Sequence, residues 1–197
     1  MIRFSFILSI VFVLFSCRNK PSYSEIIESK RDFIESSFLG PNSPLLLKDK
    51  ERFSGLSYYG VDSNYRVHAR VVWDLNAEPI YLNRDTMKSS LFFPSAILKF
   101  SLGSDSFNLT GYTRSLQAKG NIFIPFYDLT SGKETYAGGR FLDVVSSDNK
   151  WVILDFNLSY NPSCAYNPKY ICPVPPFSND LKVHITAGEK KPSFLSN

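Results

Sequence analysis

Apolar and polar residues alternate along several short stretches of this chain, and this period constrains its fold more than any other feature. Between residues 65 and 73 every second residue is apolar or aromatic: Tyr65, Val67, Ala69, Val71 and Trp73. Successive side chains of a strand point to opposite faces, so the pattern predicts a strand with one buried face. Further strands are predicted over residues 91–102, 106–113, 121–127, 140–145, 151–158 and 181–187.

Turn residues separate these stretches. Gly103-Ser104-Asp105 and Ser146-Ser147-Asp148-Asn149 each join two predicted strands, as expected for hairpins. The 17 Phe and 11 Tyr residues favour strands over helices. Short strands at close spacing are typical of a mainly β fold, here an antiparallel barrel or sandwich.

One helix is predicted before the strands. Ser22-Tyr23-Ser24-Glu25 has the form of a capping box, and Gly40-Pro41 ends the pattern. The apolar positions recur at helical spacing, which predicts an amphipathic helix packed on the sheet: Ile26, Ile27, Phe33, Ile34 and Phe38. The charged positions are expected on the solvent side: Glu28, Lys30, Arg31, Asp32 and Glu35.

The first residues have the layout of an export signal. Arg3 precedes an apolar run over residues 4–15, and Cys17 follows Ser16. This resembles a bacterial lipoprotein signal, in which the cysteine accepts the lipid. A run of this length is too short to span a bilayer at about 1.5 Å per residue. An ordinary cleaved signal or a core helix are the alternatives.

The lipoprotein interpretation divides the chain. Residues 1–16 are removed, 17–23 form a lipidated tether, 24–191 form one globular domain and 192–197 a C-terminal tail. Cys17 then anchors the protein to the lipid bilayer of the cell envelope. Arg18 follows Cys17 where inner-membrane retention signals carry Asp, which favours the outer membrane or the cell surface.

Cysteine use and charge limit the partners. Cys164 and Cys172 are expected to form a disulfide in an exported protein, with two separate thiols or a metal site as alternatives. Only two histidines occur, so no metal and no cofactor are expected. The net charge is +4 without any basic run, which argues against a nucleic-acid partner.

Polar residues gather between positions 125 and 190, where a plain sheet would carry aliphatic ones. Strand alternation places Asp155 and Asn157 on one face, and Arg140 is the expected bidentate partner of Asp155. Asp143 is three positions from Arg140 and should point to the opposite face.

Two interpretations of this polar cluster remain open. In the functional one, Arg140 faces an anionic or carbonyl group, and Asp128 or Asp155 is the general base. Gly138-Gly139 would let the backbone approach a ligand, which would be oriented by Tyr136, Asn157 and Asn161. In the structural one, the same groups form a turn and a buried ion pair that joins two strands.

Long sequence words in this region resemble the domain-of-unknown-function 1684 family. They are Pro125–Asp143, Asp155–Tyr166, Cys172–Asn179 and the closing Ala187-Gly188-Glu189-Lys190. Ser178 departs from the family pattern, which has Glu there. The resemblance implies no established activity.

Two classes of function therefore stay open. One is an envelope lipoprotein with a small-molecule binding or hydrolytic pocket around Arg140 and Asp155. The other is a non-catalytic envelope lipoprotein that binds a protein or cell-wall partner.

Overall fold

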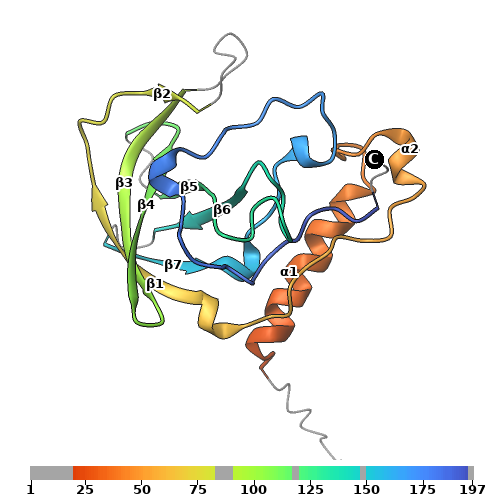
Figure 1. Ribbon diagram of the computed structural model, residues 1–197, viewed down its shortest axis with the longest axis horizontal. Helices are drawn as coiled ribbons and strands as arrows, with labels where there is room; N and C mark the ends of the chain where they lie inside the picture. The colour runs from red at the N-terminus through yellow and green to blue at the C-terminus, as the bar shows by residue number, and fades with distance from the viewer. Residues whose placement is uncertain (1–19, 83–90, 117–119, 147–149, 195–197) are drawn as a thin grey trace, which may run out of the picture.

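The chain folds as a mainly β protein, in agreement with the predicted class. A computed structural model describes residues 20–82, 91–116, 120–146 and 150–194, and Figure 1 shows its arrangement. The elements in chain order are α1 (Tyr23–Phe38), α2 (Leu47–Lys50), β1 (Arg66–Trp73), β2 (Ile80–Tyr81), β3 (Leu91–Leu102), β4 (Asp105–Thr113), β5 (Asn121–Phe126), β6 (Arg140–Val145) and β7 (Trp151–Asp155), with four single-turn 3-10 helices at Ser63–Tyr65, Phe156–Leu158, Ser163–Ala165 and Phe177–Asn179.

The strands form one antiparallel sheet that curls into a nearly closed barrel. Its order is β6-β5-β4-β3-β1-β7, and the short β2 pairs with β3. The two ends of this order, β6 and β7, also contact each other. The seam between β4 and β5 is the weak one, because only Tyr112 and Phe123 are paired across it.

The barrel interior is the core of the protein. The side chains that point inward come from every main strand and are almost completely shielded from water. They include Ala69, Leu98, Leu109, Ile122, Ile124, Leu142 and Leu154. Burying one such aliphatic side chain stabilises the fold by about 1.5–3 kcal/mol, so the inward positions of the strands supply most of the stability.

The α1 helix packs beside the barrel and begins as predicted. The Ser22 hydroxyl accepts from the Glu25 backbone N–H, and the Glu25 carboxylate accepts from the Ser22 N–H, which is a complete capping box. The predicted faces were partly wrong. Arg31 is buried and donates to the backbone carbonyls of Tyr59 and Asn157, whereas Phe33 is 79% exposed.

The Arg31 burial has a simple cause. A guanidinium can satisfy several carbonyl oxygens at once, and Arg31 lies where the segment before β1 passes the helix. Phe33 lies instead on the exposed side of α1. Helical spacing alone places Arg31 and Phe33 near the boundaries between the predicted apolar and solvent faces, so it does not decide which of the two is buried.

The predicted strand over residues 181–187 was wrong, although its alternation is real. Leu181, Ile185 and Ala187 are buried and the intervening residues are exposed, yet the segment joins no ladder. It crosses the barrel in front of the sheet (Figure 1) and bonds instead to the segment after β5. There the Leu181 N–H donates to the Tyr127 carbonyl, and the Leu129 N–H donates to the Val183 carbonyl.

The predicted strand over residues 151–158 ends early. β7 stops at Asp155, whose carboxylate accepts from the Asn157 N–H at 3.2 Å and starts a 3-10 turn. Asn157 therefore does not share a strand face with Asp155.

The ends of the chain bear on the predicted division. Residues 1–16, and Cys17 with them, lie outside the described residues. Among the helices that the structure describes, none is long and apolar enough to cross a membrane. Packing continues past the expected domain end at residue 191, because Phe194 is buried against Phe53 and Tyr166.

Candidate functional site

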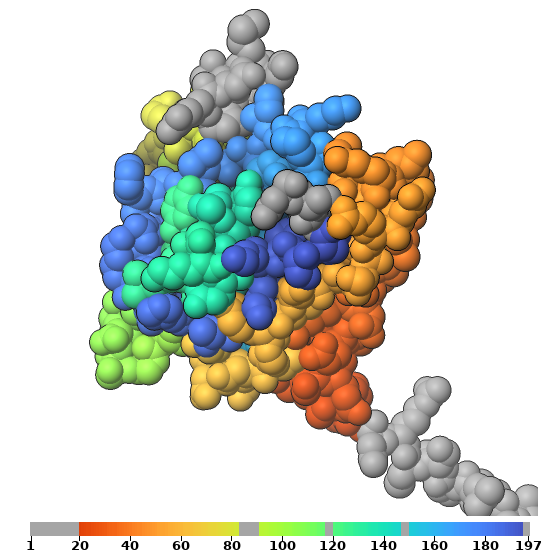
Figure 2. All heavy atoms as spheres, turned by 45° about the vertical axis from the view of Figure 1, so that its right-hand side comes forward, coloured from red at the N-terminus to blue at the C-terminus, as the bar shows by residue number. Residues whose placement is uncertain are grey.

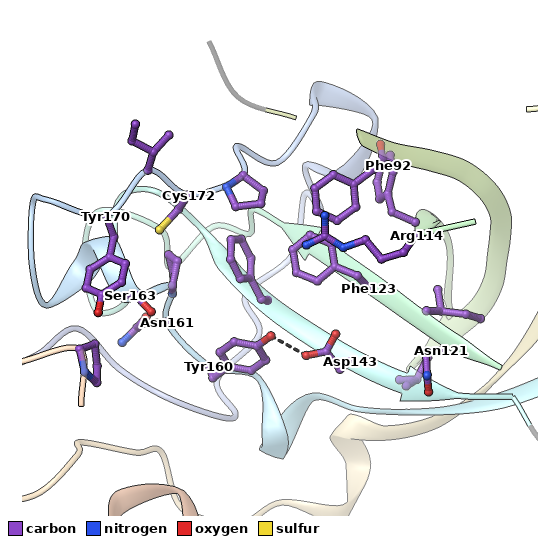
Figure 3. Close-up of a pocket in the computed structure, with 18 of the residues that line it drawn as sticks. Phe92, Arg114, Asn121, Phe123, Asp143, Tyr160, Asn161, Ser163, Tyr170 and Cys172 are labelled. Atoms are coloured by element: carbon purple, nitrogen blue, oxygen red, sulfur yellow. Dashed lines mark hydrogen bonds between the residues drawn. The ribbon is translucent and has the colours of Figure 1, made fainter. Parts of the chain in front are cut away.

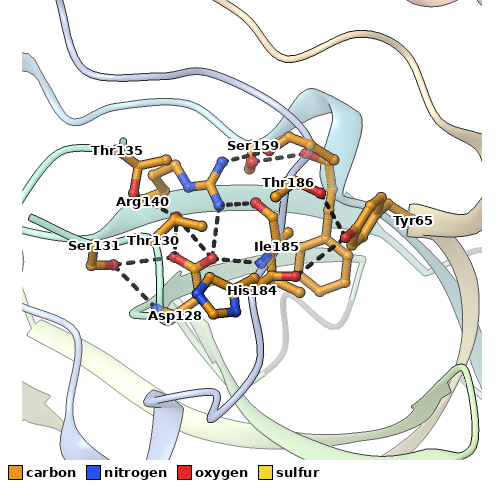
Figure 4. A network of polar contacts seen from close by, with 12 residues as sticks. Tyr65, Asp128, Thr130, Ser131, Thr135, Arg140, Ser159, His184, Ile185 and Thr186 are labelled. Carbon is orange, nitrogen blue, oxygen red and sulfur yellow. Dashed lines mark hydrogen bonds and ion pairs between the residues drawn. The ribbon is translucent and has the colours of Figure 1, made fainter. Parts of the chain in front are cut away.

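Arg140, the expected ligand-binding residue, is sealed inside the protein. It opens β6, and its side chain is 0% exposed. Its Nη1 donates to the backbone carbonyls of Ala187 and Glu189, and its Nη2 donates to that of Ile185 at 2.9 Å. The guanidinium therefore binds the protein's own C-terminal segment (Figure 4).

Asp128 is the acidic partner of Arg140. The Arg140 Nη2 atom lies 3.4 Å from Asp128 Oδ2, and both side chains are completely buried. The same carboxylate oxygen accepts from the Ile185 N–H at 2.7 Å, and the Thr130 hydroxyl donates to both oxygens. Burial lowers the pKa of Arg140, and the Asp128 carboxylate opposes this shift. Every oxygen of this carboxylate is occupied by the fold, which leaves no lone pair directed at a ligand.

The predicted pair between Arg140 and Asp155 is not formed. Asp155 has other partners. Its Oδ1 accepts from the Tyr23 hydroxyl at 2.8 Å, and its Oδ2 lies 3.9 Å from Arg66 Nε. The prediction assumed that β7 presents Asp155 to the barrel interior, whereas the strand ends there and the carboxylate turns to α1. The structural interpretation thus had the right kind of ion pair and the wrong carboxylate.

Three buried amides join segments that are far apart in the sequence. Asn157 donates to the Asp62 carbonyl and accepts from the Asp62 N–H, holding the segment before β1. Asn161 donates to the Lys190 carbonyl at 2.8 Å. Asn179 pairs with both backbone groups of Thr110 in β4 and also donates to the Pro125 carbonyl in β5.

Asn179 explains how the weak β4–β5 seam holds together. An amide presents one acceptor and two donors, and here all three are matched to backbone groups of the two strands. The side chain replaces ladder bonds that the strands do not make with each other. These amides, two of which were predicted to orient a ligand, position the backbone.

The glycine pair also has a packing role in place of the predicted ligand contact. Gly139 has φ +83°, and a Cβ there would lie 2.7 Å from the Phe126 carbonyl oxygen. Tyr136 lies beside it with its ring packed on the cluster of Phe38 and Tyr166. Neither glycine backbone faces an open site.

Cys164 and Cys172 are close together as free thiols. The Cys164 backbone N–H donates to Cys172 Sγ at 3.1 Å. The Cys172 thiol, by its hydrogen bond to Cys164, lowers the pKa of Cys164 to about 7, and the same bond raises the pKa of Cys172. Their disulfide stays a prediction. Among the described residues, no group of three or more His, Cys, Asp or Glu side chains could hold a metal ion.

An open groove lies on the outer face of β5 and β6 (Figure 3). It has a volume of about 820 Å³, within the range typical of small-molecule sites. Outward-pointing residues of the two strands form its floor, namely Phe123, Phe141 and Asp143, because these positions alternate with the core positions. Its walls come from the start of β3, the end of β4 with Arg114, the end of α1, Pro44 and the loop over residues 160–173.

A row of aromatic rings runs through this groove. Phe92 stacks on Phe123 with ring centroids 5.4 Å apart, Phe123 meets Phe141 edge-on at 4.8 Å, and Phe141 meets Tyr160 edge-on at 5.9 Å. Such contacts fix the rings against each other, so the groove has a preformed apolar surface.

A cation stands at one end of the row, and a carboxylate lies beside its middle. The Arg114 guanidinium lies 4.0 Å from the centroid of the Phe92 ring and forms no ion pair with any carboxylate that the structure describes. Asp143 is the cross-strand neighbour of Phe123, and it accepts from the hydroxyl of Tyr160, the last ring of the row. Burial, reinforced by Asp143, raises the pKa of Tyr160 well above its ordinary value. The groove can therefore accept an anionic group near Arg114.

Sequence reasoning did not find the groove. Its residues come from six separate segments, over residues 38–44, 92, 112–114, 121–123, 141–145 and 160–173, and no spacing connects them. The available signal was the outward pattern of β5 and β6, which carries Phe123 and Phe141 where a solvated strand face would carry polar residues.

The comparisons with known proteins place this geometry in a family. Residues 51–190 match the family described as "Protein of unknown function (DUF1684)". The chain belongs to the DUF1684 family. The solution NMR structure of an uncharacterized protein from Haloarcula marismortui is similar to it, with 34% sequence identity and a TM-score of 0.69 over 84% of this chain and 92% of that one. None of the curated proteins is significantly similar in sequence.

The sequence motifs that carried the family resemblance have structural roles in this DUF1684 protein. Arg140, Asp128, Asn157, Asn161 and Asn179 all lie within words that carried the resemblance, and all of them bond to the protein's own backbone. In this chain, the polar residues of the DUF1684 words hold the barrel and its C-terminal segment together.

Glu189, in the closing word, gives a test of this buried network. Its Oε2 accepts from the Asn161 N–H at 2.9 Å, and burial raises its pKa from 4.5 to about 8. The folded protein thus binds this proton more tightly than the unfolded chain does. The stability contributed is present below pH 4.5 and is lost as the pH rises to about 8.

Over this pH window the wild type should lose up to about 4 kcal/mol of its free energy of unfolding. We expect Glu189→Gln, which cannot ionise, not to show this loss. The free energy of urea unfolding, measured at several pH values, checks this, with the exposed Glu51→Gln as the matched control. A Glu189→Gln curve parallel to that of the wild type across the window would contradict the assignment.

Proposed function

We propose that this protein binds a small anionic molecule with a flat apolar body in the groove over β5 and β6, and that it does so at a membrane. The observation that carries the proposal is the row of rings that ends at Arg114, a cation without an ion pair to any carboxylate in the described part of the chain. This moves the proposed binding pocket from Arg140 of β6 and Asp155 of β7 to the outer face of β5 and β6.

The chemistry of the groove supports binding over catalysis. Ligand sites are typically apolar surfaces with a few polar groups that fix orientation. Here the rings supply the surface, Arg114 supplies a cation for a carboxylate, sulfonate or phosphate, and Asp143, which accepts from Tyr160, is a polar acceptor beside Phe123. Neither histidine of the chain lines the groove, so it lacks the usual general base.

The place of action follows from the N-terminal sequence. The signal-like run over residues 4–15 and Cys17 support a lipoprotein that is attached to the outer membrane or cell surface. Several acyl chains bind a bilayer stably where a single one does not. The ligand would therefore be a molecule that reaches the envelope.

Arg114→Gln tests the groove. Anilinonaphthalene sulfonate, a flat aromatic anion, serves as the fluorescent probe. We expect Arg114→Gln to weaken its binding by about tenfold, since the lost cation would have met the sulfonate. Lys133→Gln, which removes an exposed lysine that does not line the groove, is the control and should leave the affinity unchanged. Equal affinities for the wild type and both variants would refute the groove.

Cys17→Ser tests the anchor separately. In a bacterial host fed with labelled palmitate, we expect the wild type to carry the label and to sediment with membranes, and the variant to do neither. Cys172→Ser, which leaves Cys17 in place, is the matched control. Label that persists on Cys17→Ser would place the lipid on another residue. A wild type without label would exclude the lipid.

A further inference from the structure

A second surface of the molecule combines exposed apolar and basic side chains. On the outer face of β1 and β7, Trp151 is 50% exposed and Ile153 38% exposed. The strand register places Arg70 opposite Trp151 and His68 opposite Ile153. Exposed aromatic residues that alternate with cations are unusual on a solvated strand face.

The α1 helix extends this surface. Lys30 of α1 and Arg66, His68, Trp151 and Ile153 of the two strands line a single hollow of about 460 Å³. Helix residues three or four positions apart lie on one side. Ile26, Lys30 and Phe33 therefore share one flank, on which Phe33 is 79% and Ile26 41% exposed.

The two flanks of α1 differ in charge. Glu25, Glu28 and Asp32 follow one another at helical spacing on the other flank, so the acids lie away from Lys30. Figure 2 shows α1 on the outside of the molecule. Two carboxylates do line the hollow: Asp155, which is held by Tyr23 and Arg66, and Asp143, which accepts from Tyr160. The basic side chains of this surface are Lys30, Arg66, Arg70 and His68.

We propose that this surface, formed by one flank of α1 and the outer face of β1 and β7, docks on an anionic lipid bilayer. The named occupant is the headgroup layer of a membrane that contains anionic phospholipids. Exposed Trp and Phe side chains prefer that layer, and each nearby Lys or Arg is attracted to its negative charge.

The start of the described chain supports this occupant. Lys20 is the first described residue and α1 begins at Tyr23. If Cys17 carries the lipid, five residues separate the anchor from α1, and the six steps from Cys17 to Tyr23 reach at most about 20 Å. The surface next to the beginning of α1 is thus held against the bilayer. The inference rests on the proposed anchoring, and it orients the molecule on the membrane.

The chain contains its own probe for this docking. It has two tryptophans, so Trp73→Phe leaves Trp151 as the only reporter. The full-length lipidated variant is placed on vesicles of phosphatidylcholine and phosphatidylglycerol with brominated acyl chains, which quench a tryptophan that lies in the membrane interface. Flotation of the vesicles reports the anchoring independently.

The matched control carries its reporter on the far side of the barrel. Phe177 is 97% exposed on a 3-10 helix that contacts β4, and β4 is three strands from β7 in either direction around the sheet. The triple variant Trp73→Phe, Trp151→Phe, Phe177→Trp therefore reports a position that should point away from the membrane.

We expect the Trp151 emission to be strongly quenched and blue-shifted, and the emission from position 177 to be unaffected. Lys30→Gln, Arg66→Gln and Arg70→Gln together should remove most of the quenching, and so should vesicles of phosphatidylcholine alone. Protein that floats with the vesicles while Trp151 stays unquenched overturns the docking and leaves the anchoring intact. Protein that does not float refutes the anchoring. If Trp151 also stays unquenched at high lipid concentration, the docking is refuted as well.

Discussion

The buried pair of Arg140 and Asp128 is the interaction on which the rest of the structure depends. The segment after residue 181 crosses the barrel without a strand partner, so its backbone groups need bonds from elsewhere. Asp128 accepts from the Ile185 N–H, and Arg140 donates to the carbonyls of Ile185, Ala187 and Glu189. Two side chains thus provide hydrogen bonds that a neighbouring strand would otherwise provide.

This arrangement explains why a structural network resembles an active site in the sequence. Charged and amide residues within a strand-rich chain suggest catalysis, because both uses need polar groups inside the protein. Their partners distinguish the two uses. Asn179 meets backbone groups on every side, Asn157 meets the Asp62 backbone and the side chains of Tyr23 and Asp155, and Asp128 meets hydroxyls and an N–H of its own chain. Such groups are costly to bury unless they are satisfied, and here the fold satisfies them.

The fold class and the strand positions could be predicted, because alternation depends on which side of each residue is buried. β3 and β6 have the predicted bounds, and the capping box at Ser22 begins α1 as expected. Alternation does not report hydrogen-bond partners. Residues 181–187 alternate without a ladder for that reason, and the end of β7 at Asp155 depends on a local side-chain bond that periodicity cannot detect.

The groove could not be predicted, because its rings come from segments that only the closed barrel brings together. The barrel interior is structural, whereas we propose that the outer face of β5 and β6 binds a ligand and that the outer face of β1 and β7 meets the membrane. The two surfaces share a border at Asp143, which lines both hollows. A ligand in the groove would then lie beside the membrane surface.

The central claim is that the polar core holds the fold and the groove binds the ligand. The free energy of unfolding of Arg140→Met, compared with that of Arg114→Gln, tests it most directly. We predict a loss of about 3–5 kcal/mol for Arg140→Met, because Asp128 is left buried without its cation. Arg114→Gln should stay within about 0.5 kcal/mol of the wild type. An Arg140→Met protein as stable as the wild type would contradict the claim.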